Sequence, residues 1–254
     1  YAFTYTSIEK FTIPPHLKEI SGDVFYCCQK LRIIEFPKNS ELQSILFGAF
    51  SFSSITDISI PSCLKIIGEN SFAFCKKIQT FEMPLNSELQ TIDWCMFNHS
   101  FIKSIIIPPQ IKIIYNFAFA NCIKLQNVNI PPNSELQSIK NRSFENCPFT
   151  SFTIPSNLKI IGDGAFFKCT NLRNIEIPKN SKLQIIEAFK DTQIERIIIP
   201  SSVIELSDGW CSGTSKLNNI FVMENNKRYK LYDNKFIIGK SNIEQEEYDI
   251  LIFA

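Results

Sequence analysis

The sequence contains few of the residues that build catalytic or metal-binding sites. It has 254 residues but only two histidines, His16 and His99, and only eight glycines. It has no His-Glu-x-x-His, no phosphate-binding loop, no Gly-x-Ser-x-Gly and no Cys-x-x-Cys motif. An active site needs converging reactive groups, which this composition does not supply. We therefore expect no enzyme activity and no cofactor, and we expect both histidines to lie on the surface.

The sequence also lacks a charge excess and a long apolar segment. Lys and Arg together number 26 against 25 for Asp and Glu, and no run of Lys or Arg approaches the five or more of a basic tract. This balance argues against nucleic acid as a partner. No stretch of 18 apolar residues occurs, so we expect no membrane insertion by this segment.

What is present is a repeat of proline at intervals of mostly 23 or 24 residues, with one phenylalanine column position between consecutive prolines. The prolines are Pro14, Pro37, Pro61, Pro84, Pro108, Pro131, Pro155, Pro178 and Pro200. The phenylalanines are Phe3, Phe25, Phe50, Phe72, Phe97, Phe119, Phe144, Phe166 and Phe189. A period of this length predicts a solenoid, whose units bury their apolar faces against each other.

Two types of unit alternate, with a combined period of 47 residues. One type has Leu-x-x-Ile soon after proline, and the other inserts Asn-Ser before Leu-Gln-x-Ile. Before each proline, residues such as Ile175 and Ile177 alternate with polar ones, which predicts short strands stacked as one parallel sheet. The Ala-Phe or Ser-Phe step predicts a short helical or 3₁₀ segment on the opposite side. The phenylalanines predict a stacked interior spine.

This pattern resembles the leucine-rich repeats of the BspA-like class, LxxIxIPxxLxxIGxxAFxxCxxL, over residues 1 to about 223. Two units depart from it. The unit at 179–200 lacks two residues before Phe189, and the last unit places Trp210 in the phenylalanine column and Met223 at the proline position. The resemblance implies an α/β solenoid: a horseshoe with a parallel concave sheet and with short helical or 3₁₀ and extended segments on the convex side.

The repeat pattern stops near residue 224. We expect residues 1–223 to form the array, in about ten units of which the first is partial, and residues 224–254 to form a β-hairpin cap or a segment between repeat blocks. Residues 229–232 and 236–239 flank an Asp233-Asn234 turn and predict the hairpin, and residues 248–253 predict a third strand. Since residue 1 falls inside a repeat, we expect the chain to be a piece of a longer array.

Several of the nine cysteines recur at a fixed position of the repeat. Cys28, Cys75, Cys122 and Cys169 each follow a column phenylalanine by three residues, in every second unit. Their expected Cα separation of about 10 Å is too long for disulfides among them. Cys147 occupies the same column between Cys122 and Cys169. We consider three interpretations of this cysteine column: a disulfide involving Cys147, a thiol–metal site, and simple packing of small buried residues.

Two N-glycosylation sequons occur, Asn98-His99-Ser100 and Asn141-Arg142-Ser143. Both fall in the predicted convex turns, where a glycan would be exposed. Use as glycosylation sites and chance occurrence are both open interpretations.

The concave face is the candidate binding surface, because its exposed columns vary whereas the buried ones hardly do. A recognition face and a solvated sheet would both show this variation. The candidate protein-binding residues are Glu35, Glu82, Lys103, Ile106, Asn129, Arg173, Glu176, Ile198 and Phe221.

Two features of this face are specific. Glu35, Glu82 and Glu176 recur in one unit type, with Arg32 and Arg173 beside two of them, which suggests exposed ion pairs of small energetic weight. Ile198 and Phe221 are consecutive apolar residues on a polar face. They form either a binding hot spot or a contact with the C-terminal segment.

The resemblance implies a non-catalytic, protein-binding module of a microbial surface or secreted protein. Its expected partner is a host extracellular-matrix or cell-surface protein, bound through the concave face. The alternatives are a structural spacer that displays another domain, and an intracellular scaffold, which nine cysteines without evident pairing would fit.

Overall fold

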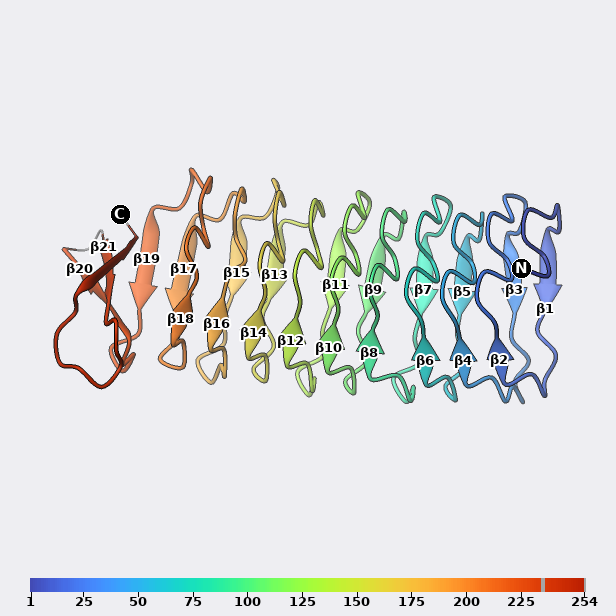
Figure 1. Ribbon diagram of the computed structural model, residues 1–254, viewed down its shortest axis with the longest axis horizontal. Coiled ribbons are helices and arrows are strands. Elements are labelled where there is room, and N and C mark those ends of the chain that lie inside the picture. The colour runs from blue at the N-terminus through green and yellow to red at the C-terminus, as the bar shows by residue number, and fades with distance from the viewer. Residues whose placement is uncertain (234–235, 254) are drawn as a thin grey trace.

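The computed structural model describes residues 1–233 and 236–253. It is a solenoid that runs as a nearly straight rod in the view of Figure 1. Each turn contributes one longer and one shorter strand, so two rows of parallel strands follow the length of the rod (Figure 1). The turns pack only on their neighbours along the chain, as in other repeat proteins.

The longer strands precede the repeated prolines, as the alternating isoleucines predict. They are β1 (Lys10–Thr12), β3 (Ile33–Glu35), β5 (Asp57–Ser59), β7 (Thr80–Glu82), β9 (Ser104–Ile106), β11 (Asn127–Asn129), β13 (Ser151–Thr153), β15 (Asn174–Glu176), β17 (Arg196–Ile199) and β19 (Asn219–Val222). In half of them the middle residue is buried and its two neighbours are exposed. The exposed side of these strands is called the long-strand face below.

The shorter strands follow the prolines and end in an isoleucine or leucine that is buried. They are β2 (Glu19–Ile20), β4 (Ser44–Ile45), β6 (Ile66–Ile67), β8 (Thr91–Ile92), β10 (Ile113–Ile114), β12 (Ser138–Ile139), β14 (Ile160–Ile161), β16 (Ile185–Ile186) and β18 (Glu205–Leu206). They form parallel ladders of three and six strands. The core lies between this row and the row of longer strands.

The prediction of one continuous parallel sheet of longer strands is wrong. Strands 23 residues apart, such as those starting at Lys10 and Ile33, pair over their whole length. Across each Asn-Ser unit the interval changes and the pairing weakens: β7 and β9, which start 24 residues apart, pair only at Thr80 and Ser104. No pairing joins β3 to β5 or β11 to β13. We attribute this to the Asn-Ser unit, which is shorter after phenylalanine than its neighbours and, except at 179–200, longer after proline.

The expected helical or 3₁₀ segment is absent, because no helix occurs in residues 1–233 and 236–253. In each phenylalanine turn, alternate backbone amides instead donate hydrogen bonds to carbonyls of the next turn of the solenoid. In the Phe25 turn, the amides of Asp23, Phe25 and Cys27 donate to carbonyls of the following turn, at 2.8–2.9 Å. Asp23 and Cys27 also have left-handed backbone, with φ of 54° and 56°. A helix needs those amides for its own i−4 carbonyls, so it cannot form here.

The predicted phenylalanine spine is confirmed. The column rings from Phe25 to Phe189 are 0–1% exposed. Consecutive rings stack with centroids 5.2–6.0 Å apart and interplanar angles of 1–21°. These values lie within the favourable range for offset aromatic stacking. The spine therefore links the turns from Phe25 to Phe189 to each other through the core.

The placement of Trp210 in the phenylalanine column is wrong. The amide of Phe189 donates to the carbonyl of Trp210, whereas in the preceding turns the acceptor is the residue just before the column position. Cys211 therefore occupies the column, and Trp210 occupies the position of Ala165 and its equivalents. The Trp210 ring is nevertheless buried and packs edge-on against Phe189, with centroids 6.3 Å apart.

After β19 the chain forms an antiparallel sheet of β20 (Tyr229–Tyr232), β21 (Phe236–Gly239) and β22 (Ile250–Phe253). Of the predicted Asp233-Asn234 turn, Asn234 lies outside the described residues. The hydroxyl of Tyr229 accepts the amide of Leu206 at 2.9 Å and donates to the carbonyl of Ile204 at 3.3 Å. This side chain therefore satisfies backbone groups at the last shorter strand, where no further turn follows to pair with them.

Candidate functional site

The long-strand face carries the residues predicted to bind a partner. The strands hold Glu35, Glu82, Ile106, Asn129, Glu176, Ile198 and Phe221, and Lys103 and Arg173 directly precede β9 and β15. All of them are exposed except Ile198, which is partly buried. The alternation of the strands places them on one side of the rod. The face is thus continuous, while its role in binding stays a prediction.

The expected Glu–Arg pairs are not formed. Glu35 instead pairs with Lys10 on the neighbouring strand, with Nζ and Oε1 2.5 Å apart, and accepts a hydrogen bond from Thr12 at 2.8 Å. These two contacts lower the pKa of the Glu35 carboxyl below its ordinary value. Among the described residues Arg32 and Arg173 take part in no ion pair. The pairing follows the register, in which Thr12 lies directly opposite Glu35.

Of the apolar pair Ile198 and Phe221, the C-terminal segment leaves Phe221 half exposed. These residues are direct register partners on β17 and β19, and Phe221 is 48% exposed. The guanidinium of Arg196 lies 4.7 Å from the centre of the Phe221 ring, a favourable cation–π distance. Sequence reasoning missed Arg196, although it precedes Ile198 by two residues and so lies on the same face of the strand.

A recess opens on this face where the β7–β9 ladder stops. It has a volume of about 420 Å³. Glu82 and Ile106 lie on its two sides, and Ile106 is 51% exposed. Met83 and Ile105, both almost fully buried, contribute to its lining. The recess therefore combines an apolar lining with one carboxylate, which suits an apolar side chain flanked by a hydrogen-bond donor.

A second recess of about 350 Å³ lies between β15 and β17, which also pair at a single position. Glu176 and Ile198 occupy the same positions there as Glu82 and Ile106 in the first recess. The two recesses thus recur because the weakened pairing recurs. The irregular 22- and 24-residue intervals were the sequence signal that could have located them.

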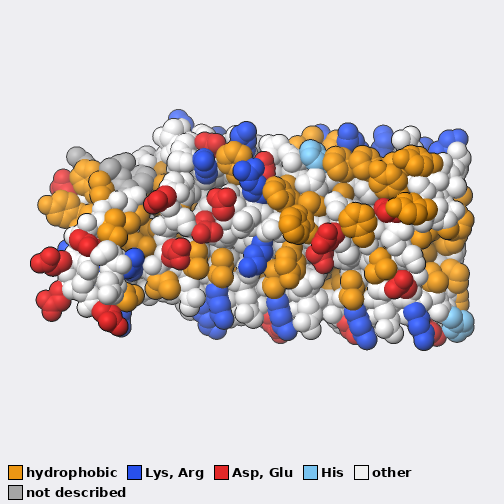
Figure 2. Space-filling model, in the orientation of Figure 1, with side chains coloured by type: hydrophobic (Ala, Val, Ile, Leu, Met, Phe, Trp, Pro, Cys, Tyr) orange, Lys and Arg blue, Asp and Glu red, His pale blue; other side chains and the backbone are white. Residues whose placement is uncertain are grey.

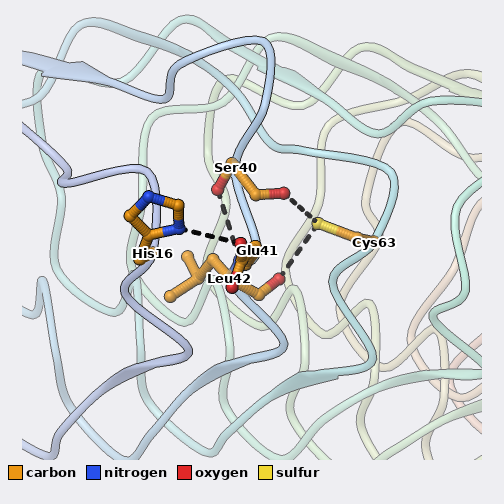
Figure 3. A network of polar contacts seen from close by, with 5 residues as sticks. All are labelled: His16, Ser40, Glu41, Leu42 and Cys63. Carbon is orange, nitrogen blue, oxygen red and sulfur yellow. Dashed lines mark hydrogen bonds and ion pairs between the residues drawn. The ribbon is translucent and has the colours of Figure 1, made fainter.

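The expected surface position of both histidines is confirmed, and His16 belongs to a structural contact. Its Nδ1 lies 2.8 Å from Oε1 of Glu41 in the Asn-Ser loop of the next turn (Figure 3). Within that loop the Ser40 hydroxyl accepts the amide of Leu42 at 3.3 Å, and the Cys63 thiol donates to the carbonyls of Ser40 and Leu42 (Figure 3). The same hydrogen bond, from the backbone amide two residues later to the serine hydroxyl, recurs at Ser87, Ser134 and Ser181. The serine of the Asn-Ser signature is therefore explained by loop structure.

The two sequons differ in exposure. Asn141 is exposed, as expected, whereas Asn98 is partly buried. The serine of each sequon, Ser100 and Ser143, is fully buried and hydrogen-bonded within the core turns. Repeat packing therefore accounts for both serines.

The cysteine column acts as a row of buried donors. Cys75, Cys122 and Cys169 each donate a thiol hydrogen bond to the carbonyl of the phenylalanine in the preceding turn, at 3.0–3.2 Å, and Cys147 does the same. Serine and threonine fill the column in other turns. Across the described part of the chain all nine cysteines are free thiols, and no three His, Cys, Asp or Glu residues lie close enough to hold a metal. Packing of small buried residues, one of the three interpretations, thus describes this column.

These buried thiols predict a loss of stability at alkaline pH. Burial raises the pKa of Cys122 and Cys169 to about 12 and that of Cys75 to about 11, from 9.0. The raised pKa values give stability that is complete below pH 9.0 and is lost as the pH rises toward 11 to 12. Each thiol should remove about 1.4 kcal/mol of unfolding free energy per pH unit in this window.

The measurement is urea unfolding of the parent and of Cys122→Ser from about pH 8 to pH 10.5. Serine occupies the same column at Ser53 and Ser100, so the variant should fold. Its stability should fall less steeply above pH 9.0 than that of the parent. Identical slopes for the two proteins would contradict the assignment.

Several solved structures are similar to this chain, among them leucine-rich-repeat proteins of bacteria. A leucine-rich-repeat protein of Bacteroides ovatus aligns at 22% identity with a TM-score of 0.56, over 85% of this chain and 73% of its own. The pneumococcal vaccine antigen PcpA aligns at 20% identity with a TM-score of 0.55, over 86% of this chain. A leucine-rich-repeat protein of Eubacterium ventriosum aligns at 19% identity with a TM-score of 0.56, over 85%. These similarities show the fold.

This chain spans 63% of the length of the pneumococcal antigen and 60% of the Eubacterium protein. No curated protein sequence matches it. Within the described residues there is no helix with the length and apolar character needed to cross a membrane. The model of the BspA-type leucine-rich-repeat region matches residues 1–126 and 90–218. Because these matches cover most of the sequence, the chain belongs to the BspA-type leucine-rich-repeat family.

Proposed function

We propose that this protein is a non-catalytic binding module that attaches a microbial surface or secreted protein to a host matrix or cell-surface protein. The observation that carries the proposal is the recess between β7 and β9, where Glu82 and Ile106 are exposed on a rigid face of stacked strands. A preorganised surface of this kind binds with little loss of conformational entropy. One solved protein of the same fold is described as a vaccine antigen, which is compatible with display at a surface.

The second recess supports the same proposal. Its carboxylate and its aliphatic side chain, Glu176 and Ile198, repeat the arrangement of the first recess further along the rod. An extended partner could occupy both sites at once, and two linked weak contacts then act together through a high effective concentration. Arg196 and Phe221 lie beside the second recess and supply the residue types that dominate many interfaces.

The test is a triple substitution on the long-strand face, Glu82→Thr, Ile106→Thr and Asn129→Thr. Thr12 and Thr153 occupy this column in other turns, so threonine suits the strand. We expect binding to immobilised extracellular-matrix proteins or to host epithelial cells to weaken about 10- to 100-fold, because the anchors of the first recess are removed.

A matched control replaces Lys65 and Lys159, which are exposed next to the row of shorter strands, by threonine. This control should bind as the parent does. Binding retained in the triple variant would contradict the proposed face. A complete lack of binding by the parent to all matrix proteins and cells would favour the spacer, with recognition elsewhere in a longer protein.

A further inference from the structure

An aromatic ladder lies on the surface of the phenylalanine turns in the N-terminal half. It consists of Tyr5, Tyr26, Phe52, Phe74 and His99, whose neighbouring ring centroids are 5.9, 5.6, 4.4 and 4.8 Å apart. All five rings are exposed or partly exposed, Tyr5 by 72% and Phe52 by 38%. Figure 2 shows a continuous band of hydrophobic side chains along the upper edge of this half, which ends at a histidine.

The backbone of these turns does not favour aromatic residues. Tyr5, Phe52, Phe74 and His99 have left-handed backbone, with φ of 56–59°, a conformation that is unusual for a bulky side chain. From residue 121 onward no aromatic residue occupies this column, which holds Asn121, Asn146, Lys168, Asp191 and Gly213. Asparagine tolerates this conformation. Neither the local conformation nor burial in the core therefore accounts for the aromatic residues, which leaves a role on the surface.

The ladder presents the edges of its central rings to solvent. Phe74 stacks on Phe52 with an interplanar angle of 2° and on His99 with an angle of 10°, so both faces of the Phe74 ring are covered. The edge of an aromatic ring carries the positive part of its quadrupole. This ridge is therefore apolar and weakly electropositive.

A basic notch adjoins the ladder. Two residues separate Cys75 from the buried Ile78, and two separate Cys122 from the buried Leu125. In the turn between them, Phe101 alone separates Ser100 from the buried Ile102, so this shorter turn is recessed between two longer ones. The recess measures about 240 Å³. Phe101 is partly buried within it, and four lysines surround it: Lys76, Lys77, Lys103 and Lys124.

The positive charge of this notch is not neutralised by the protein. No carboxylate lines the recess. Throughout residues 1–233 and 236–253 none of the four lysines forms an ion pair, and Lys103 donates to the neutral Gln79 at 2.7 Å. Elsewhere on the rod, Lys10 and Lys65 are paired with glutamates. The unpaired cluster is thus a local positive field in a protein of net charge +1.

We propose that the aromatic ladder and the basic notch together bind an acidic peptide segment of a partner protein. Carboxylates of the segment occupy the notch over Phe101, and its aliphatic side chains lie along the edges of Phe74 and His99. The two parts are continuous, because Lys76 follows Phe74, and Phe101 follows His99, by two residues. This surface is distinct from the two recesses of the long-strand face.

The ring geometry favours a peptide over other anions. Nucleic-acid bases bind aromatic residues by stacking on ring faces, and the faces of Phe74 are already occupied by its neighbours. A highly charged glycan would use the lysines but would gain nothing from an apolar ridge. Only a segment with both carboxylates and aliphatic groups matches both parts of the surface.

The test is fluorescence anisotropy with a labelled synthetic peptide in which glutamates alternate with leucines. One variant changes Lys76→Thr, Lys77→Asn and Lys124→Asn, which copies the residues of the Cys169 turn, Thr170 and Asn171. A second variant changes Phe74→Asn and His99→Asn, which copies the column at Asn121 and Asn146. Each variant should bind the peptide about tenfold or more weakly than the parent.

Both variants should unfold at the temperature of the parent, because asparagine suits the left-handed backbone and the lysines are exposed. A charge-matched control, Lys38→Asn with Lys159→Asn and Lys179→Asn, should keep the parent affinity. The long-strand variant Glu82→Thr, Ile106→Thr and Asn129→Thr should also bind the peptide normally. Failure of the matrix-binding proposal and failure of this one are therefore distinguishable.

Several results would overturn the proposal. One is a dissociation constant weaker than about 1 mM for the glutamate–leucine peptide. Another is equal binding of a lysine–leucine peptide. Binding of polyglutamate or of heparin fragments as tight as that of the mixed peptide, with no effect of Phe74→Asn and His99→Asn, would replace it by a purely electrostatic site.

Discussion

Replacing Phe119 by alanine is expected to lower the free energy of unfolding by about 3–5 kcal/mol. The Phe119 ring is fully buried and stacks on Phe97 and Phe144, with centroids 5.2 Å away on either side. Its removal creates a cavity in the middle of the spine and separates two stacked pairs. In a solenoid each turn is stabilised by its neighbours, so the damage affects the turns on both sides. The measurement is the urea unfolding midpoint of the purified protein.

The matched control for this experiment is Phe47→Ala. Phe47 is 52% exposed, so its truncation should change the unfolding free energy by about 0.5 kcal/mol or less. An unfolding midpoint of Phe119→Ala equal to that of the parent would refute the interior spine. Amide exchange should be faster in the turns of Phe97 and Phe144 than in distant turns, because local opening follows the loss of neighbour contacts.

The second large effect is expected from Asn226→Ala. Asn226 is 5% exposed, and its side-chain nitrogen donates to the carbonyls of Pro200 and Val203 at 2.7 and 3.0 Å. Its side-chain oxygen accepts the amides of Arg228 and Tyr229 at 2.8 and 2.7 Å. Alanine would leave four backbone groups without partners, each costing about 1–3 kcal/mol where water cannot reach it. We expect a loss of about 3 kcal/mol or more in unfolding free energy.

The neighbouring Asn225 is exposed and provides the control, since Asn225→Ala should leave stability nearly unchanged. Limited proteolysis of Asn226→Ala should release the segment after residue 224 first, because that side chain ties the antiparallel sheet to the last turns of the array. Parent-like stability and proteolysis would show that this sheet does not depend on Asn226. The division into residues 1–223 and 224–254, with a capping role for the latter, stays a proposal that this experiment tests.

The periodic features of the fold could be predicted from the sequence because every turn repeats the same constraint. The columns of Phe119 and Ile175 and their equivalents recur in every unit, so one interpretation applies to all turns and an error in one unit is corrected by the others. The phenylalanine spine, the strands before the prolines and the buried cysteine column all follow from such columns. Each depends on burial of apolar groups against an identical neighbour.

The convex turns were predicted incorrectly because their conformation depends on contacts between turns. A short apolar segment such as the one around Phe25 is compatible with a helical turn when it is considered alone. In the solenoid its amides pair with the next turn instead. The position of Trp210 was wrong for a related reason, because only the hydrogen bond from Phe189 reveals which residue occupies the column.

The candidate binding surfaces were likewise predicted only in part from the sequence. The alternation of buried and exposed residues predicted which side chains of the longer strands, including Glu82 and Ile106, lie on the long-strand face. The recess between them depends on where strand pairing weakens, and the basic notch depends on turns of unequal length lying side by side.

The sequence by itself determined the family, the solenoid and the composition of its core, because period and hydrophobic pattern are local properties that repeat. The tertiary structure decided the pairing of individual strands, the course of the phenylalanine turns, the partner of Glu35 and the stacking of Phe52, Phe74 and His99. These features depend on how neighbouring turns are offset from one another. That offset results from the packing of whole units. A change of one residue in the length of a unit is enough to alter this packing.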